Sequence, residues 1–393
     1  MLEWKKIWQV TVWDKKFNGV ENKMQPKVIK YHYYLANELT DLERNDGDIR
    51  ILYTTDKIAY TSPEEVEGNI SEGEVVAIPW GGNPTVKYYK GRFVTADNRI
   101  ATSNDTAVLN NKFLYYYMLS RIDVIGGFYR GAGIKHPSML SVLNMDIPIP
   151  SLSEQSRIVS ILDTFTAAIA NLKQQIEQRR KQYEYYRDRL LDLDGKEGVE
   201  MKTLGELCEI RGRIGFRGYT RDDQVSKGEG AMSLSPGNIV NGKMNYDNST
   251  YITWQKYDES PEIITYNGDI LFCKTGSTVG KVSMVDALPC RATINPQLVV
   301  LKEVKINSKY LTNYLATYKI QALVKALAGV GSVPNISQAK LAALDIQVPS
   351  LAEQSRIVGI LDTFEASIAN LEQQLEMRQK QYEYYRNQLL TFE

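Results

Sequence analysis

The sequence predicts an α+β fold: two α+β domains separated by two long helices that form an antiparallel coiled coil, with an internal pseudo-two-fold repeat. Three observations predict it. Residues 146–191 recur at 345–390, and 34 of the 46 positions are identical. Each copy carries apolar residues at heptad spacing. Each copy also follows a longer segment in which short strand patterns alternate with one or two helices.

These observations divide the chain into five parts. The two longer segments diverge in residues but share an order of features, including a glycine turn after a strand and a helix near the end, KFLYYYML in one and KYLTNYLA in the other. The expected boundaries are 1–145 for the first domain, 146–191 for the first repeat with its helix, 192–202 for a linker, 203–344 for the second domain and 345–393 for the second repeat.

The heptad pattern runs over about four heptads in each repeat, which favours a coiled coil over an ordinary amphipathic helix. Arg179 and Arg378 occupy the one seam position that is not apolar. The seam residues are Leu162, Phe165, Ile169, Leu172, Ile176, Tyr183, Tyr186 and Leu190 in the first copy, and Leu361, Phe364, Ile368, Leu371, Leu375, Tyr382, Tyr385 and Leu389 in the second.

Serine residues mark the expected start of each helix. Ser151 and Ser153 precede Glu154 in the first copy, and Ser350 precedes Glu353 in the second. A parallel pair of helices would need the short connection LDLDGKEGVEMK to be almost fully extended. We therefore expect an antiparallel pair, in which the end of the first helix lies beside the start of the second.

Composition excludes several classes of protein. Charged residues make up 24% of the chain and no apolar run reaches the roughly 18 residues that a membrane-spanning helix needs. The start of the chain has no signal-peptide pattern, so a cytoplasmic protein is expected. The three cysteines lack metal-site or redox spacing, and the two histidines lie far apart, so no metal site is expected.

Two motifs resemble catalytic sequences without matching them. GSTVGK at 276–281 has three residues between its glycines where a phosphate-binding loop has four, and Val282 stands where Ser or Thr would bind magnesium. Asn295-Pro296-Gln297-Leu298 lacks the second proline and the aromatic residue with which adenine methyltransferases hold a flipped base. No catalytic residue and no cofactor are therefore assigned to this chain.

The doubled arrangement carries a family resemblance over the whole chain. A strand that ends in proline, then SLxEQSRIVxILD, then a long helix occurs twice behind two divergent segments. This resembles the specificity subunits of type I restriction-modification systems. The resemblance implies that each divergent segment is a target-recognition domain that reads one half of a split double-stranded DNA sequence. It also implies that the helices set the spacing and dock two modification subunits, which bind S-adenosylmethionine and methylate adenine; whether two restriction subunits join them stays open.

Basic and polar residues in the loops are the candidate DNA contacts. Arginine can bind guanine in bidentate fashion, and small polar side chains can read base edges. A solvated surface loop is the alternative for the arginine-rich loop RGRIGFRGYTRDD, and a docking face for RRKQYEYYRDR on the first helix. The candidates are Asn83, Lys87, Lys90, Arg92, Arg130 and Lys135 in the first domain, and Arg211, Arg213, Arg217, Tyr219, Lys274, Ser277, Thr278, Lys281, Ser332 and Asn335 in the second.

Two other classes of function compete with a DNA-specificity subunit. A single-chain DNA methyltransferase or nuclease would need a catalytic motif that the sequence does not show. An assay of methyl transfer by the purified chain distinguishes this enzyme class from a non-catalytic subunit. A coiled-coil scaffold for protein partners would bind no DNA sequence specifically. Lys plus Arg equals Asp plus Glu at 47 each, so any DNA contact must come from local groups rather than from overall positive charge.

Overall fold

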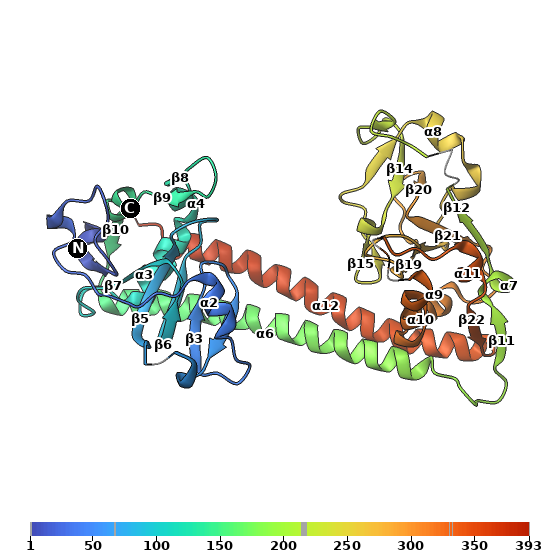
Figure 1. Ribbon diagram of the computed structural model, residues 1–393, viewed down its shortest axis with the longest axis horizontal. Helices are drawn as coiled ribbons and strands as arrows, with labels where there is room; N and C mark the ends of the chain where they lie inside the picture. Colours follow the sequence, from blue (N-terminus) through green and yellow to red (C-terminus); the bar gives the residue numbers. More distant parts are fainter. Residues whose placement is uncertain (1, 67, 214–217, 330, 332, 393) are drawn as a thin grey trace. The chain divides into compact units, whose positions relative to one another are not determined.

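The computed structural model describes residues 2–66, 68–213, 218–329, 331 and 333–392. The chain divides into two compact units: unit 1, Met1–Lys173 with Gln374–Glu393, and unit 2, Gln174–Gln373. Helices α6 (Leu152–Leu190) and α12 (Leu351–Leu389) each contribute residues to both units. Figure 1 shows α6 in green and α12 in red.

Unit 1 is built on a six-stranded sheet with the order β2-β7-β5-β6-β3-β4, in which only β3 and β6 are parallel neighbours. Its strands are β2 (Thr11–Trp13), β3 (Ile49–Leu52), β4 (Ile58–Thr61), β5 (Ser71–Pro79), β6 (Lys87–Thr95) and β7 (Asn98–Ser103). Two short antiparallel pairs accompany the sheet: β1 (Glu3–Lys6) with β10 (Asp146–Ile149), and β8 (Tyr129–Arg130) with β9 (His136–Pro137).

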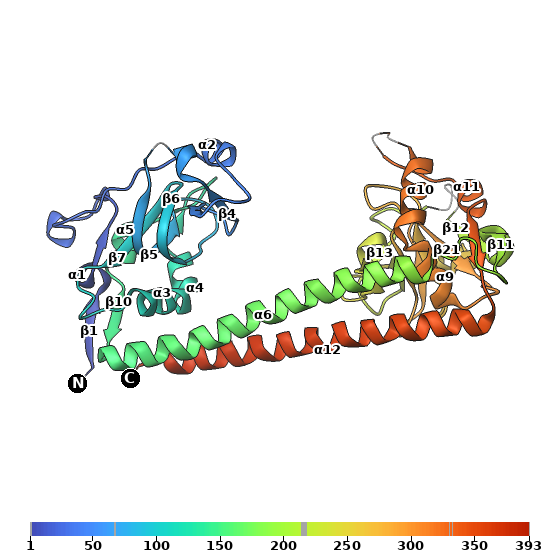
Figure 2. The same ribbon diagram turned by 90° about the horizontal axis from the view of Figure 1, so that it is seen from below.

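Alternating side chains of β5 divide the core of unit 1 between the two faces of the sheet. Val76 and Ile78 belong to the same buried apolar cluster as Phe113 of α3 (Asn111–Ser120), and Val75 and Ala77 belong to a separate cluster. In Figure 2, α3 lies between the sheet and α6. The helices of unit 1 besides α6 and α12 are α1 (Ile7–Val10), α2 (Ala36–Asp41), α3 (Asn111–Ser120), α4 (Ile122–Gly126) and α5 (Met139–Leu143), with 3-10 turns η1 (Asn22–Met24) and η2 (Pro63–Val66).

Unit 2 contains two four-stranded sheets. The first has the order β12-β21-β18-β19 and the second β13-β17-β14-β20. The first comprises β12 (Glu209–Gly212), β21 (Leu298–Lys302), β18 (Ile270–Cys273) and β19 (Val282–Met284); the second comprises β13 (Gln224–Val225), β17 (Thr250–Ile252), β14 (Ala231–Leu234) and β20 (Ala292–Ile294). The short pairs are β11 (Glu200–Thr203) with β22 (Asp345–Val348) and β15 (Ile239–Val240) with β16 (Lys243–Met244).

Unit 2 has three layers, two of sheet and one of helices. Leu271 of β18 packs with Leu234 of β14, so one apolar cluster joins the two sheets. Phe272, the next residue of β18, points to the other face and belongs to the same apolar cluster as Tyr310 and Leu311 of α9 (Ser308–Leu315). The helices of unit 2 besides α6 and α12 are α7 (Leu204–Leu207), α8 (Trp254–Asp258), α9 (Ser308–Leu315), α10 (Tyr318–Ala328) and α11 (Gln338–Ala342), with 3-10 turns η4 (Pro236–Asn238) and η5 (Pro261–Ile263).

The antiparallel pairing of the long helices is confirmed within each unit. In unit 1, Phe165 near the start of α6 stacks on Tyr385 near the end of α12, with ring centroids 5.3 Å apart. In unit 2, Tyr186 near the end of α6 stacks on Phe364 near the start of α12, also at 5.3 Å. The α+β fold with paired long helices is therefore as the sequence predicts.

The expected helix starts are also confirmed. The hydroxyl of Ser151 accepts a hydrogen bond from the backbone N–H of Glu154 at 3.3 Å, and Ser350 accepts one from Glu353 at the same distance. After α6 the chain stays packed on unit 2, because Leu193 is only 2% exposed. Strand β11 begins at Glu200, inside the segment expected to be a linker.

Candidate nucleic-acid interface

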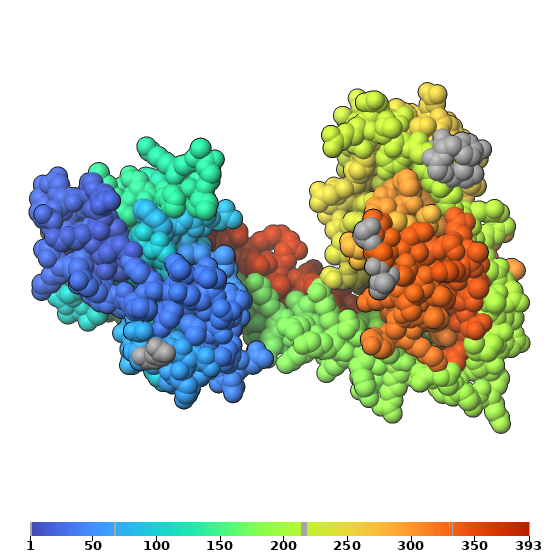
Figure 3. Space-filling model, viewed as in Figure 1, coloured from blue at the N-terminus to red at the C-terminus, as the bar shows by residue number. Residues whose placement is uncertain are grey.

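Two loops of unit 1 are fastened to each other. The turn between β5 and β6, residues 80–86, lies against the loop between β8 and β9, residues 131–135; we call them the paired loops of unit 1. The N–H of Gly82 donates to the carbonyl oxygen of Lys135 at 3.0 Å. A Cβ atom at Gly81 would lie 2.8 Å from Cγ2 of Ile134 and 3.1 Å from Cε1 of His136, so a larger residue there would require these side chains to move. The β8–β9 hairpin projects from the surface of unit 1 in Figure 3.

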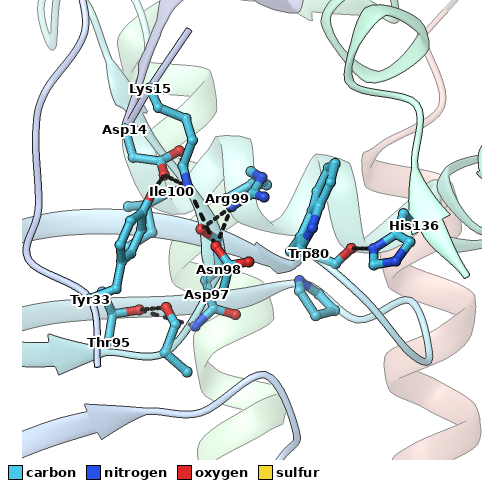
Figure 4. Close-up of polar contacts among 12 residues, drawn as sticks. Asp14, Lys15, Tyr33, Trp80, Thr95, Asp97, Asn98, Arg99, Ile100 and His136 are labelled. Carbon is cyan, nitrogen blue, oxygen red and sulfur yellow. Dashed lines mark hydrogen bonds and ion pairs between the residues drawn. The ribbon is translucent and has the colours of Figure 1, made fainter. Parts of the chain in front are cut away.

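Trp80 anchors the base of the turn. The Arg99 guanidinium lies 3.9 Å from the centre of its ring, and the His136 ring lies 4.9 Å from it. Nδ1 of His136 is 2.7 Å from the carbonyl oxygen of Trp80, which can only accept, so Nδ1 carries the proton (Figure 4). Arg99 is itself held by Asp97, to which Nη1 donates at 2.7 Å. The stack therefore fastens the turn to both β7 and β9.

Unit 2 has a matching pair of loops. The turn between β18 and β19, residues 274–281, lies against residues 333–336; these are the paired loops of unit 2. The N–H of Gly276 donates to the carbonyl oxygen of Pro334 at 2.9 Å, and the hydroxyl of Thr275 donates to Oδ1 of Asn335 at 2.6 Å. The loops of both units are thus joined through a turn glycine.

Equivalent residues in the second loops of the two units are separated by the same number of positions as the two copies of the repeat. Lys135 and Pro334 are 199 positions apart, the same shift that relates residues 146–191 to 345–390. Both use their carbonyl oxygen to accept from the turn glycine, Gly82 in unit 1 and Gly276 in unit 2. The structural equivalence therefore extends upstream of the nearly identical repeat into segments where the residues differ.

A second hydrogen bond between the paired loops is donated by a backbone group in unit 2 and by a side chain in unit 1. In unit 2 the N–H of Ile336 donates to the carbonyl oxygen of Lys274 at 2.9 Å. Pro137 stands at the equivalent position of unit 1 and has no N–H. The imidazole of His136 donates to the Trp80 carbonyl instead. A side chain thus replaces a backbone donor, and the pairing of the loops is preserved.

Most predicted residues of unit 1 lie on its surface. Lys90 pairs with Glu74 at 3.6 Å and Arg92 with Asp48 at 3.1 Å. Asn83 lies in the exposed part of the turn, and Arg130 and Lys135 are exposed on the hairpin. The hydrogen bond between Gly82 and Lys135 therefore places Asn83 and Lys135 on adjoining loops, whereas Lys90 and Arg92 lie within β6.

Lys87 is placed differently from the other lysines. Its ammonium group donates to the carbonyl oxygens of Tyr53 and Thr55, the latter at 2.6 Å. Burial lowers the pKa of Lys87 to about 8, since the charged form loses solvation. The ammonium group of Lys87 therefore binds the segment that follows β3.

The predicted residues of unit 2 divide in the same way. Ser277 is exposed at the tip of the turn, Lys274 and Thr278 are half-buried, and Asn335 is exposed although bound to Thr275. Arg211 is exposed and pairs with Glu209 at 2.7 Å. Arg217 and Ser332 lie outside the described residues.

Arg213 is buried in unit 2, and Lys281 is exposed but has its ammonium group bound to backbone carbonyl groups. Arg213 is 6% exposed and donates to the carbonyl oxygen of Ile294 at 3.2 Å. Burial lowers the pKa of its guanidinium, but arginine stays charged. Lys281 donates to the carbonyl oxygen of Ile239 at 3.0 Å. Tyr219 shares a 2.8 Å hydrogen bond with Ser233 of β14.

Sequence reasoning missed the residues that fasten the loops. Besides Trp80, Arg99 and His136 in unit 1, Gln321 of α10 donates to the carbonyl oxygen of Gly280 at 2.8 Å in unit 2. Tryptophan directly after the predicted strand, before Gly-Gly-Asn-Pro, was the one local signal. The others come from distant parts of the sequence and carry no motif.

The basic run on α6 is partly used by unit 2 itself. Arg180 pairs with Glu372 of α12 at 2.6 Å, and Arg187 with Asp188 at 2.9 Å.

Among the described residues, no three His, Cys, Asp or Glu side chains gather as metal ligands would. No helix in the described part of the chain is long and apolar enough to cross a membrane.

Comparison with known proteins identifies the family. The profile of the type I restriction modification DNA specificity domain matches residues 22–179 and again 196–377. This chain belongs to the type I restriction-modification specificity subunits. A specificity subunit provides the DNA sequence specificity of such a system and works with DNA and with the other subunits. It is not the catalytic component.

Individual relatives agree with the assignment. The specificity subunit of the EcoR124I/EcoR124II type I restriction enzyme of Escherichia coli is 34% identical over 303 residues, 73% of each chain. A putative specificity subunit of Haemophilus influenzae is 31% identical over 355 residues, 83% of this chain and 85% of that one. The crystal structure of an S subunit from M. genitalium shares the fold over 100% of this chain and 97% of its own, with a TM-score of 0.60 at 16% identity.

Proposed function

We propose that this specificity subunit reads a bipartite DNA target, in which each unit contacts one half through its paired loops. The observation that carries the proposal is that both units build the same pair of loops while their exposed tips differ. Asn83 and Lys135 stand at the tips in unit 1, and Ser277 and Asn335 in unit 2. A shared scaffold with different polar tips suits two domains that read different base edges.

The candidate residues take two roles in this proposal. Exposed side chains of the paired loops contact DNA, together with the half-buried Lys274 of the same loops and with Arg130, which directly precedes the second loop of unit 1. Lys87, Arg213 and Lys281 have their donors on backbone carbonyl groups, so they stabilise the domain behind the loops. Lys90, Arg92, Arg211 and Tyr219 would meet DNA only if it extends beyond the loops.

The paired helices set the spacing between the half-sites and dock two modification subunits. Those subunits bind S-adenosylmethionine and methylate adenine, so this chain itself needs no cofactor. The complex acts in the cytoplasm on double-stranded DNA, and two restriction subunits join it where DNA is also cleaved.

Methylation mapping of the reconstituted complex tests the reading of half-sites. We expect Asn83→Ala to relax base discrimination in one half of the target and Ser277→Ala in the other, each by about 10-fold at one base position, because a lost base contact costs roughly 1–3 kcal/mol. A randomised DNA library, sequenced after methylation, gives both halves in one experiment.

Each variant is the control for the other, because both lie in the same complex. Lys87→Met, whose ammonium group is turned into the domain, should leave the base preferences of both halves unchanged. Equal relaxation of both halves by Asn83→Ala would contradict the proposal.

A further inference from the structure

An exposed branched apolar residue occupies the same place in both sets of paired loops. Ile134 is 70% exposed in unit 1 and Val333 is 62% exposed in unit 2. They are 199 positions apart, as are Lys135 and Pro334, which follow them. Two domains that diverge in sequence therefore present the same class of side chain at an equivalent exposed position.

The backbone behind each of these side chains is fixed. The next residue accepts a hydrogen bond from the turn glycine in both units, at 3.0 Å for Lys135 and 2.9 Å for Pro334. In unit 1, Ile134 also passes directly over Gly81. The apolar group is therefore presented from an anchored loop, which lowers the entropy that binding would cost.

Exposed polar residues lie near both apolar side chains in the sequence: Lys135 follows Ile134 directly, and Asn335 lies two residues after Val333. Ile134 stands among Gly131, Gly133 and Lys135, with Asn83 exposed on the facing turn. Protein-docking surfaces are usually larger and contiguous in their apolar area. A single alkyl group flanked by hydrogen-bond donors instead matches the major-groove edge of thymine, which shows a C5-methyl group beside the O4 acceptor.

We propose that Ile134 and Val333 are equivalent apolar base contacts, each packing on the C5-methyl group of a thymine in the half-site that its unit reads. This inference rests on the proposed reading of half-sites by the paired loops. It adds an apolar contact that neither motif nor charge pointed to, and it assigns the same role to both units.

Uracil substitution tests the contact directly, because uracil lacks only the methyl group of thymine. The complex with modification subunits is titrated with target duplexes in which single thymines are replaced by uracil. For the unsubstituted subunit we expect one uracil in each half-site to weaken binding about 3- to 10-fold, as the loss of a buried methyl group predicts.

The variants assign each methyl group to its unit. Ile134→Ala should lose sensitivity to the uracil in one half-site and keep it in the other, and Val333→Ala should do the reverse. Ile134→Val, which keeps a branched alkyl group, should retain most of the effect. Thermal unfolding of each variant checks that the exposed substitutions leave the fold intact.

Three outcomes overturn the inference. One is that no thymine is sensitive to uracil, and another is that Ile134→Ala weakens binding to all DNA sequences equally. The third is that Ile134→Ala weakens assembly with the modification subunits, which would make the loop a protein contact. If Asn83→Ala still changes one half-site, only the apolar contact fails; if neither variant affects a half-site, the proposed function fails as well.

Discussion

At the scale of single residues, burial decides what a charged group does. Asp14 is 3% exposed and directly follows β2; its Oδ1 accepts a hydrogen bond from the N–H of Ile100 in the neighbouring strand β7 at 3.0 Å (Figure 4). Tyr33 donates to its other oxygen at 3.3 Å. Burial raises the pKa of Asp14 to about 6, and the hydrogen bond from Ile100 and the charge of Lys15 offset only part of that rise.

Asp14→Asn is expected to change how the stability of unit 1 depends on pH. The folded pKa, about 6, lies above the unfolded value, 3.8, so the folded state binds more protons between these two pH values. The contribution of Asp14 to stability is therefore complete below about pH 4 and is lost as the pH rises through 6. At pH 7.5 the variant should be more stable than the natural chain by on the order of 1–3 kcal/mol.

Tryptophan fluorescence during urea unfolding measures this effect. Four of the five tryptophans, Trp4, Trp8, Trp13 and Trp80, belong to unit 1, so the signal reports mainly on that unit. At pH 4 the variant and the natural chain should be nearly equally stable. A difference in stability that does not vary between pH 4 and pH 7.5 would refute the assignment.

At the scale of elements, one buried glutamine fastens each long helix to its domain. Gln155 of α6 is fully buried; its Oε1 accepts from the N–H of Asn110 at 2.8 Å, and its Nε2 donates to the carbonyl oxygens of Val108 and Pro150. Gln354 of α12 makes equivalent contacts in unit 2. Each repeat thus carries its own attachment point for the domain that precedes it.

Gln155→Ala is expected to destabilise unit 1 by about 2–4 kcal/mol, because the substitution leaves buried backbone groups without partners. Urea unfolding followed by tryptophan fluorescence gives the free energy of unfolding. Gln379→Ala is the matched control: Gln379 lies on α12 within unit 1 but is exposed, and its loss should cost less than about 0.5 kcal/mol. Equal effects of the two substitutions would show that Gln155 is not an attachment point.

At the scale of the whole molecule, each half of the duplication consists of a domain that diverges in sequence and a long helix that does not. Domains of divergent sequence precede helices of nearly identical sequence, and each helix contributes to both units. The net charge of zero indicates that local groups rather than overall attraction provide the DNA contacts. In the proposed function, the length of the paired helices then sets which distance between half-sites is accepted.

Inserting one heptad after Leu172 and another after Leu371 tests the spacing role. Seven residues preserve the seam and lengthen the helix pair by roughly 10 Å, which matches up to about three base pairs of duplex. Three base pairs also rotate one half-site by about 100°, so we expect a gain of one to three pairs and reduced activity.

Methylation mapping of the insertion variant reads the spacing directly. Both half-site sequences should stay unchanged, which serves as the internal control for folding of the two domains. Active complexes that still methylate only the original spacing would exclude the helices as the element that sets it.

The sequence alone determined the features that depend on local pattern. The repeat at an offset of 199, the heptad seam and the serine helix starts are periodicities or short motifs, and they were enough to predict the paired helices and the family. The tips of the glycine turns, such as Asn83 and Ser277, were also correctly placed on the surface, because turn chemistry is local.

Only the tertiary structure decided which polar residues face solvent and which form hydrogen bonds to other groups of their own domain. Lys87 and Arg213 look like surface cations in the sequence, yet the first is bound to carbonyl groups after β3 and the second to the carbonyl group of Ile294. The stack of Arg99, Trp80 and His136 likewise joins segments far apart along the chain. Burial and such long-range contacts depend on which strands and loops become neighbours, and no local pattern encodes that.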